Sequence, residues 1–130
     1  MRITEVSKKY ELSADTLRYY ERIGLIPPVN RNSSGIRDYT EEDCSWVYFI
    51  KCMRNAGLSI EVLAEYVTMF QQGNETIKAR KKLLIEQRCL LDERIKEMQK
   101  VLERLDNKID GYEERVEKYQ KNLKNLKEIK

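Results

Sequence analysis

Three cysteines are the side chains of this 130-residue sequence best suited to covalent chemistry. Cys44, Cys52 and Cys89 are odd in number and widely spaced, which favours a reduced, cytoplasmic protein over a disulfide framework. Cys52 lies between Lys51 and Arg54, and positive charge favours the reactive thiolate, whereas a position near the C-terminal end of a predicted helix opposes it. A lone intracellular cysteine more often fills a core. Sensing and packing therefore both stay open for Cys52, and packing is favoured for Cys44 and Cys89.

Other reactive groups are missing from the sequence. Histidine is absent, which removes Ser–His and Cys–His nucleophile pairs and most zinc sites. The sequence contains no GxGxxG and no Walker-type loop. No cysteine follows Cys89, so a C-terminal metal or iron–sulfur loop is poorly supported. We therefore expect no enzymatic activity, no metal and no cofactor.

Arginine and tyrosine side chains form a second group, which suits binding to phosphate. The formal net charge is only +3, and residues 1–74 carry 9 basic against 10 acidic residues. Residues 75–130 carry 16 basic against 12 acidic residues. Bulk charge therefore does not indicate DNA binding by the first half, and only the local placement of arginines can do so.

A helix-turn-helix is the element that would position these side chains. Ile3, Val6 and Tyr10 recur at helical spacing, and Ser13 is the predicted N-cap of a second helix that Gly24 ends. The second helix presents a basic, hydroxyl-rich face suited to phosphates and base edges, formed by Thr16, Arg18, Tyr19 and Arg22. A solvated face with incidental arginines would show the same pattern, so the two interpretations stand about even on this helix alone.

A β-hairpin is predicted next, because two short extended runs flank the polar turn of residues 32–35. Arg31 and Arg37 lie on its two arms, as expected of a wing that holds the DNA backbone. Two further helices follow, one opened by a capping box at Thr40 and one capped by Ser59. Their apolar stripes are predicted to form the core and comprise Trp46, Phe49, Ile50 and Met53, then Ile60, Leu63, Val67 and Phe70.

The second half of the sequence shows a heptad pattern that predicts a coiled coil. Its alternating four-three spacing runs without a miss through what we name the heptad seam: Leu91, Ile95, Met98, Leu102, Leu105, Ile109, Tyr112, Val116, Tyr119, Leu123 and Leu126. Upstream of Leu91, Ile77 and Leu84 continue the heptad register. The alternate seam positions there hold the charged residues Lys81 and Arg88. Gly111 interrupts the exposed side and slightly favours a hinge or kink.

The predicted fold is therefore mainly α. We expect a winged helix-turn-helix head (helix-turn-helix, β-hairpin wing and two further helices) over residues 1–73. A long coiled-coil dimerisation helix over residues 74–110 and a helical extension over residues 111–130 follow. The dimerisation residues are Leu84, Leu91, Ile95, Met98, Leu102, Leu105 and Ile109. No run of apolar residues is long enough to span a membrane.

The sequence resembles the MerR family of transcriptional regulators. The resemblance is carried by residues 4–7, by Leu-Arg-Tyr-Tyr-Glu-Arg-Ile-Gly-Leu-Ile at 17–26, by Gly-Ile-Arg-Asp-Tyr-Thr at 35–40 and by Met-Arg-Asn-Ala-Gly-Leu-Ser at 53–59. It covers residues 1–75 by sequence and the long helix by architecture. The family implies DNA contacts from Arg18, Tyr19 and Tyr20 on the second helix, from Arg37 and Tyr39 on the wing, and from Arg54. With Ser13, Thr16, Arg22 and Arg31 these complete the candidate DNA-binding residues.

The resemblance also implies a mechanism. A homodimer with antiparallel long helices would bind double-stranded promoter DNA and distort its spacer, so that RNA polymerase engages both promoter elements. The stretch of residues 43–59 resembles the aldehyde- and electrophile-responsive NmlR/AdhR-like branch, which implies that Cys52 is a thiol sensor in a stress response. The charges that flank the heptad seam do not fix the helix direction. A MerR-type regulator with a non-thiol inducer and a coiled-coil protein-interaction module are the alternatives.

Overall fold

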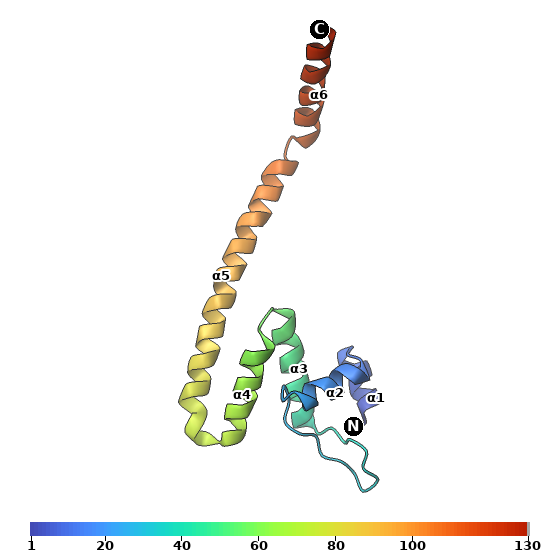
Figure 1. Ribbon diagram of the computed structural model, residues 1–130, viewed down its shortest axis with the longest axis vertical. Coiled ribbons are helices and arrows are strands. Elements are labelled where there is room, and N and C mark those ends of the chain that lie inside the picture. The colour runs from blue at the N-terminus through green and yellow to red at the C-terminus, as the bar shows by residue number, and fades with distance from the viewer. Residues whose placement is uncertain (130) are drawn as a thin grey trace. The chain divides into compact units, whose positions relative to one another are not determined.

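The computed structural model describes the backbone of residues 1–129 and the side chains of residues 1–124. Leu126, the last predicted residue of the heptad seam, therefore lies outside the described side chains. The described chain is mainly helical, as predicted (Figure 1). Its elements are α1 (Ile3–Tyr10), α2 (Ala14–Arg22), α3 (Glu41–Asn55), α4 (Ile60–Gln72), the 3₁₀ turn η1 (Asn74–Thr76), α5 (Ile77–Ile109) and α6 (Tyr112–Ile129).

The helix-turn-helix is confirmed, and its turn is short because both helix ends are capped. Glu11 ends α1 in the left-handed conformation, with φ 54°, and its backbone N–H donates to the Ser7 carbonyl. Ser13 then begins α2, where its hydroxyl oxygen accepts a hydrogen bond of 3.0 Å from the Thr16 backbone N–H. Gly24, with φ 79°, follows the end of α2, a conformation that glycine adopts without strain.

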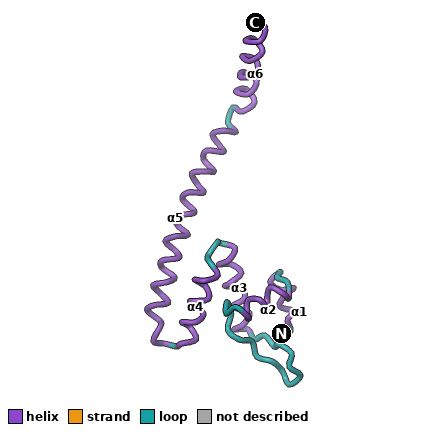
Figure 2. The backbone as a smooth tube through the Cα atoms, viewed as in Figure 1, coloured by secondary structure: helices purple, strands orange, loops and turns teal. Residues whose placement is uncertain are grey.

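The wing is a loop in the structure and not a pair of regular strands (Figure 2). Within the described residues, one antiparallel bridge joins Arg31 to Arg37. The Asn32 N–H donates to the Ile36 carbonyl at 2.8 Å, and the Asn32 side chain accepts from the N–H groups of Ser34 and Ile36. The predicted hairpin is therefore correct as a chain reversal and wrong as a two-stranded element. Side-chain-to-backbone bonds hold its tip where ladder bonds were expected.

Two capped helices complete the head. Thr40 and Asp43 form the predicted capping box of α3: the Asp43 N–H donates to the Thr40 hydroxyl at 3.1 Å, and the Thr40 N–H donates to the Asp43 carboxylate at 2.9 Å. The Ser59 hydroxyl accepts from the Val62 N–H and so begins α4. These bonds satisfy backbone donors that would otherwise be unpaired at the helix starts.

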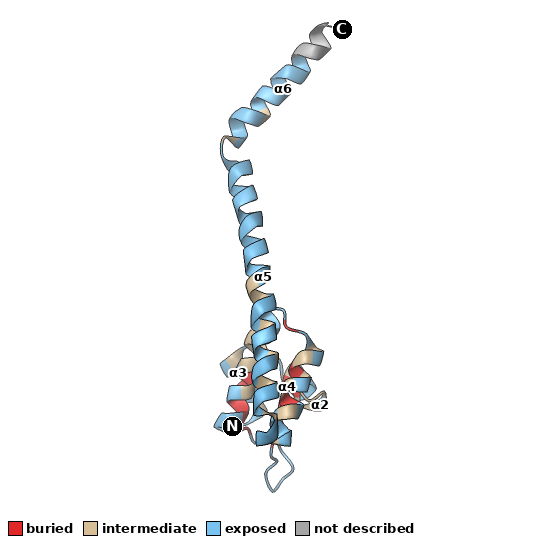
Figure 3. Ribbon diagram, turned by 90° about the vertical axis from the view of Figure 1, so that its left-hand side faces the viewer, coloured by how far each residue is buried: buried red, intermediate tan, exposed pale blue. Residues whose placement is uncertain are grey.

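The core lies within the head, which contains all of the buried residues among the described side chains (Figure 3). Side chains from α1, α2, the wing, α3 and α4 form it, namely Val6, Leu17, Tyr20, Leu25, Ile26, Val29, Tyr39, Cys44, Val47, Ile50, Leu58, Leu63 and Val67. The predicted stripes of α3 and α4 reach this core only in part. Trp46, Phe49 and Met53 are half-buried against it, and Phe70 is exposed.

A hydrogen-bonded corner joins α4 to α5. The Thr76 hydroxyl lies 2.6 Å from the Met69 carbonyl and 2.8 Å from the Gly73 carbonyl. Arg80 donates from Nε to the Thr76 hydroxyl at 3.0 Å, and its guanidinium lies 5.1 Å from the centroid of the Phe70 ring. The first turn of α5 is therefore fixed to the end of α4.

The chain divides into two compact units, Met1–Arg88 and Cys89–Lys130. The first unit contains the head and about three turns of α5. The second contains the rest of α5 and α6, which separate at Gly111, with φ 65°, where the sequence favours a kink. Among the described residues, no helix combines the length and the apolar character that crossing a bilayer requires.

Candidate DNA-binding surface and thiol site

The exposed face of α2 carries the candidate DNA contacts of the recognition helix. Arg18 pairs with Asp15 one turn earlier at 3.0 Å, in a solvent-exposed ion pair. The Arg22 guanidinium lies 5.5 Å from the centroid of the Tyr19 ring. Exposed ion pairs add little stability, so phosphate oxygens can replace Asp15 as the partner of Arg18 at low cost.

Ser13 and Thr16 already have a structural role at the start of α2. Besides the capping bond, their hydroxyl groups lie 2.8 Å apart and share a hydrogen bond. Both hydroxyls can take part in further bonds, because each oxygen has one donor and two acceptor sites. The predicted contacts of these two residues are thus compatible with their capping role.

The two wing arginines differ in their surroundings. Arg31 is exposed, and its guanidinium donates across the turn to the Gly35 carbonyl at 3.0 Å. Arg37 points to α2 instead, where its Nε donates to a carboxylate oxygen of Glu21 at 2.7 Å. Arg31 therefore lies on the open surface of the wing, whereas Arg37 ties the wing to the recognition helix.

Glu21 is the centre of this tie, and sequence reasoning did not identify it as a functional residue. One of its oxygens accepts from Arg37, and the other accepts from the Val29 N–H at 2.9 Å. Burial raises the pKa of Glu21, but the bonds from Arg37 and Val29 and the charges of Arg37 and Arg31 outweigh it, so that the net pKa lies below its ordinary 4.5. We name these three residues, Glu21, Val29 and Arg37, the wing clamp.

Tyr20 and Tyr39 are buried, which corrects the expectation that both face DNA. Tyr20 is 7% exposed and Tyr39 is 2% exposed, because both rings fill the core between α2, the wing and α3. Burial raises the pKa of both phenols. The Tyr39 hydroxyl has no hydrogen-bond partner among the described residues. In the free protein these two tyrosines pack in the core below the candidate DNA-binding surface of α2 and the wing.

Arg54 lies at the end of α3, as predicted, with an exposed side chain. Its guanidinium donates to the Leu58 carbonyl at 2.7 Å and so bridges the turn between α3 and α4. Its charge partly offsets the burial that raises the pKa of Tyr20. Arg54 thus belongs to the same part of the head as α2, and contact with a phosphate remains a prediction.

Cys52 is half-buried on α3 and has a tyrosine neighbour. A side-chain hydrogen bond with Cys52, and the charge of this sulfur, raise the pKa of the exposed Tyr48 one turn earlier. The Tyr48 ring in turn lies 6.1 Å from the Tyr10 ring at the end of α1. The Lys51 ammonium donates to the Tyr10 carbonyl at 2.5 Å. Cys52 is therefore next to the contact between α3 and the first helix of the helix-turn-helix.

The other cysteines have different environments. Cys44 is 5% exposed and belongs to the core, with its thiol 4.0 Å from the Met1 sulfur. Cys89 is exposed on α5. Within the part of the chain that the structure describes, no cluster of cysteine, aspartate or glutamate side chains suits a metal ion.

The predicted dimerisation residues lie on α5, and none of them is buried. Leu91 is half-buried, and the others are exposed: Leu84, Ile95, Met98, Leu102, Leu105 and Ile109. The α6 part of the heptad seam is likewise open, with Tyr112, Tyr119 and Leu123 exposed. A charged helix with one apolar stripe of this length matches a coiled-coil seam that a partner would cover.

A helix-turn-helix, a wing with arginines and two supporting helices together define a winged helix-turn-helix DNA-binding domain. The chain matches the family model for MerR HTH family regulatory proteins over residues 1–69. It also matches the model described as MerR, DNA binding, over residues 45–108. The protein belongs to the MerR family of DNA-binding transcriptional regulators, which are not enzymes.

Known relatives support the AdhR/NmlR-like branch of this family. The HTH-type transcriptional regulator AdhR of Bacillus subtilis is 61% identical over 93 residues, which are 72% of this chain and 66% of AdhR. A MerR family regulator from Listeria monocytogenes has a crystal structure with a TM-score of 0.86 and 50% identity, covering 98% of this chain and 96% of that one. HiNmlR, a MerR family regulator lacking the sensor domain and bound to promoter DNA, has a TM-score of 0.81 and 29% identity, covering 87% and 90%.

Proposed function

We propose that this regulator binds a promoter as a homodimer, distorts the DNA between the two half-sites, and responds to aldehydes or other electrophiles through Cys52. The observation that carries the sensing proposal is the position of Cys52, half-buried on α3 one turn after Tyr48, whose ring packs near Tyr10 at the end of α1. The DNA-bound structure of the related HiNmlR supports binding to a promoter.

DNA binding is supported by the shared location of the arginines. Arg18 and Arg22 lie on α2, and Arg31 lies on the wing that the wing clamp holds against α2. Two such heads bind half-sites about 34 Å apart, or a multiple of this distance. The 33 residues of α5 span about 50 Å at about 1.5 Å per residue, which is long enough to set this spacing.

Distortion of the promoter would allow RNA polymerase to engage both promoter elements. Bending a site of this size costs on the order of 1–6 kcal/mol. The cost must be met by contacts that the bend permits, which here are the wing and α2 contacts of both heads. A change in head geometry that alters the binding free energy by even part of this cost would therefore switch the promoter between its undistorted and distorted states.

The chemistry at Cys52 is an addition that needs no oxidant. The sulfur forms a bond to the carbonyl carbon of the aldehyde, the C=O π bond breaks, and the thiol proton ends on the carbonyl oxygen. The adduct adds bulk beside Tyr48, one turn earlier on α3, whose ring lies 6.1 Å from that of Tyr10. Because Tyr10 ends α1, the adduct changes the packing of the helix-turn-helix.

The test is promoter-dependent transcription with purified protein, with and without a reactive aldehyde. We expect the wild type to respond and Cys52→Ser to lose the response. Cys89→Ser is the matched control, because Cys89 is a more exposed thiol on α5, and its loss should leave the response intact. An equal response in wild type and Cys52→Ser, or none in either, would contradict the thiol switch while leaving the DNA-binding dimer untouched.

A non-thiol inducer is the second candidate, and one cavity favours it. Glu42, Ser45, Trp46, Phe49 and Tyr66 line an open hollow of about 220 Å³ between α3 and α4. Its aromatic walls and single carboxylate suit a small, apolar cation. An aldehyde-independent inducer should lose its effect in Trp46→Ala and keep it in Cys52→Ser.

A further inference from the structure

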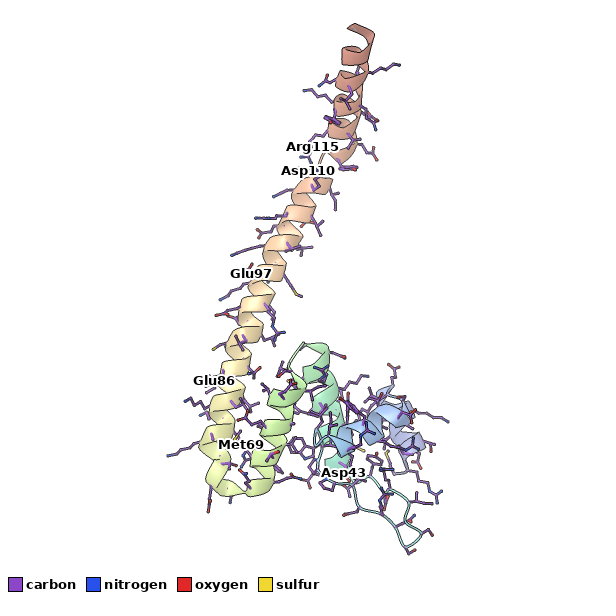
Figure 4. The ribbon with its side chains drawn as sticks, viewed as in Figure 1. Asp43, Met69, Glu86, Glu97, Asp110 and Arg115 are labelled. Atoms are coloured by element: carbon purple, nitrogen blue, oxygen red, sulfur yellow. The ribbon has the colours of Figure 1, made fainter. Side chains whose placement is uncertain are left out.

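Three aromatic rings in the head form a triangle between α3 and α4. The two helices lie side by side, and side chains of both fill the space between them (Figure 4). The ring centroids are 6.2 Å apart for Trp46 and Phe49, 6.0 Å apart for Trp46 and Tyr66, and 5.8 Å apart for Phe49 and Tyr66. All three side chains are half-buried, so part of each remains accessible. We name these three residues the ring triangle.

The open hollow of about 220 Å³ between α3 and α4 lies against the ring triangle. Glu42 and Ser45, both from the start of α3, complete its lining. Among the lining residues Glu42 is the only charged one, and its side chain is exposed. The volume lies below the roughly 300–1,000 Å³ of sites that enclose a drug-sized ligand, so the hollow accepts only a small group.

The geometry of the ring triangle favours a positively charged group. Aromatic faces attract a cation that lies within about 6 Å of the ring centroid. Because the centroids are about 6 Å apart, a cation up to about 5 Å above the ring triangle meets this condition for all three rings at once. The carboxylate of Glu42 adds an opposite charge at the same hollow.

The lining also selects among cations, because most of it consists of rings. A primary ammonium has three N–H donors, which lose their water when rings enclose them and then need acceptors. The lining offers such acceptors only at Glu42, Ser45 and the Tyr66 hydroxyl. A quaternary ammonium carries methyl groups in place of these donors, so contact with three rings leaves no donor unpaired. The hollow therefore suits a fully alkylated cation best.

The same aromatic cluster already holds one cation of the protein itself. The Phe70 ring lies 5.0 Å from the Trp46 ring, and the Arg80 guanidinium lies 5.1 Å from the Phe70 centroid. Arg80 also donates to the Thr76 hydroxyl and to the Gly73 carbonyl at the corner between α4 and α5. Trp46 is thus shared between the hollow and the contacts that fix the first turn of α5. A ligand against Trp46 has a direct structural connection to this corner.

We propose that the hollow at the ring triangle is a binding site for a quaternary ammonium group, with the three rings around the cation and Glu42 as its counter-charge. The proposal rests on the second candidate of the proposed function, the non-thiol inducer, and gives that inducer a chemical class. The remainder of such a ligand extends from the open hollow into solvent. Cys52 lines no part of the hollow, so Cys52→Ser should bind the same ligand unchanged.

Trp46 is the only tryptophan of the chain, so its fluorescence reports binding directly. The probe is choline chloride, titrated into the whole chain and compared with the same concentrations of sodium chloride. The matched probe is the uncharged isostere of choline, in which a tert-butyl group replaces the trimethylammonium group. We expect a saturable fluorescence change with choline, and an affinity about tenfold higher than that for the isostere.

Two substitutions test the parts of the site and keep the Trp46 reporter. Glu42→Gln should lower the affinity for choline about threefold to tenfold and leave the affinity for the isostere unchanged. Glu41→Gln is its matched control, because it removes the same charge from the same turn of α3 but does not line the hollow. Tyr66→Leu keeps an apolar wall without a ring, so it should weaken choline binding more than binding of the isostere.

The proposal is overturned if choline causes no saturable change in Trp46 fluorescence, or if Glu41→Gln lowers choline affinity as much as Glu42→Gln does. Equal affinities for choline and its isostere would also overturn it, and would identify the hollow as an apolar contact surface for another protein segment. Promoter-dependent transcription tests the function separately. If choline binds but leaves transcription unchanged, the site stands and the non-thiol inducer fails. If choline does not bind, the site fails and the thiol switch at Cys52 is unaffected.

Discussion

Removing the charge of Glu21 is the sharpest test of how the head holds its wing. The substitution Glu21→Gln keeps the shape of the side chain and one acceptor for the Val29 N–H. It removes the ion pair with Arg37, whose side chain is 22% exposed against 15% for that of Glu21. A hydrogen bond between charged groups contributes about 1.5–3 kcal/mol, and the amide, with its one oxygen on the Val29 N–H, cannot replace the bond from Arg37. We therefore expect the free energy of unfolding to fall by about 1–2 kcal/mol.

The pH dependence gives this prediction a second signature. The pKa of Glu21 is lowered in the folded protein from its ordinary 4.5. The stabilisation is therefore fully present above the unfolded value and is lost as the pH falls through the folded pKa. The difference in unfolding free energy between wild type and Glu21→Gln should be constant from about pH 6 to 8 and shrink below about pH 4.5. Urea denaturation at a fixed protein concentration measures it.

Measurements of DNA binding distinguish the positioning role of the wing clamp from a simple effect of the lost charge. Loss of a negative charge close to DNA strengthens nonspecific binding, whereas a loosened wing weakens binding to the operator. We expect operator affinity to fall about tenfold, which corresponds to about 1.4 kcal/mol. Asp15→Asn is the matched control, because it removes the same charge from the same helix but breaks only the exposed pair with Arg18.

The control variant should leave stability within about 0.5 kcal/mol of wild type, with equal or tighter DNA binding. Gel-shift titrations at one salt concentration compare the two variants. If Glu21→Gln and Asp15→Asn tighten operator binding alike, Glu21 acts only through its charge, and the wing clamp does not position the wing. An unchanged unfolding free energy for Glu21→Gln at neutral pH would refute the energetic part of the reasoning.

Three further predictions concern single side chains. Arg18→Ala should weaken operator binding by about 1–3 kcal/mol with the melting temperature unchanged, and equal affinity in a gel shift would remove α2 from the DNA-binding surface. Thr40→Ala should lower the unfolding free energy by about 1 kcal/mol through loss of the α3 cap, whereas Thr40→Ser should restore it in the same denaturation assay. Gly111→Ala should disfavour the left-handed α5–α6 junction by about 1–2 kcal/mol, and faster or slower hydrogen exchange around Arg115 reports the change, with an identical profile counting against it.

Helix starts and the heptad seam could be predicted because their causes are local in the sequence. The N-caps Ser13, Thr40 and Ser59 each bond a backbone N–H within three residues, so their residue types alone indicate the helix start. The heptad seam follows from spacing along one helix, and its exposure on α5 is the consequence of a stripe whose proposed partner is another chain. The kink at Gly111 follows from glycine in an otherwise unbroken helical pattern.

The wing clamp and the two buried tyrosines could not be predicted, because they depend on chain reversal. Glu21 and Arg37 are sixteen residues apart and meet only after the chain turns through the wing. Tyr20 and Tyr39 face the core for the same reason: the wing covers the side of α2 that a free helix would leave open. The resemblance to the MerR family implied DNA contacts for both residues, and nothing local in the sequence indicates the burial of Tyr39.

The five candidate DNA-binding arginines of the head already have partners in the free protein, so DNA binding is an exchange of partners. The salt dependence of binding can count these exchanges. Arg18, Arg22 and Arg31 are exposed and can turn to phosphates without leaving a buried charge unpaired. Arg37 is held by Glu21, and release would leave that half-buried carboxylate without its ion-pair partner. The slope of log affinity against log salt is about −0.9 for each phosphate neutralised. Three exchanging arginines per head predict about −5 for a dimer, whereas release of Arg37 and Arg54 as well predicts about −9. A measured slope near −9 would mean that the wing clamp opens on the operator, and Glu21→Gln should then bind more tightly rather than less.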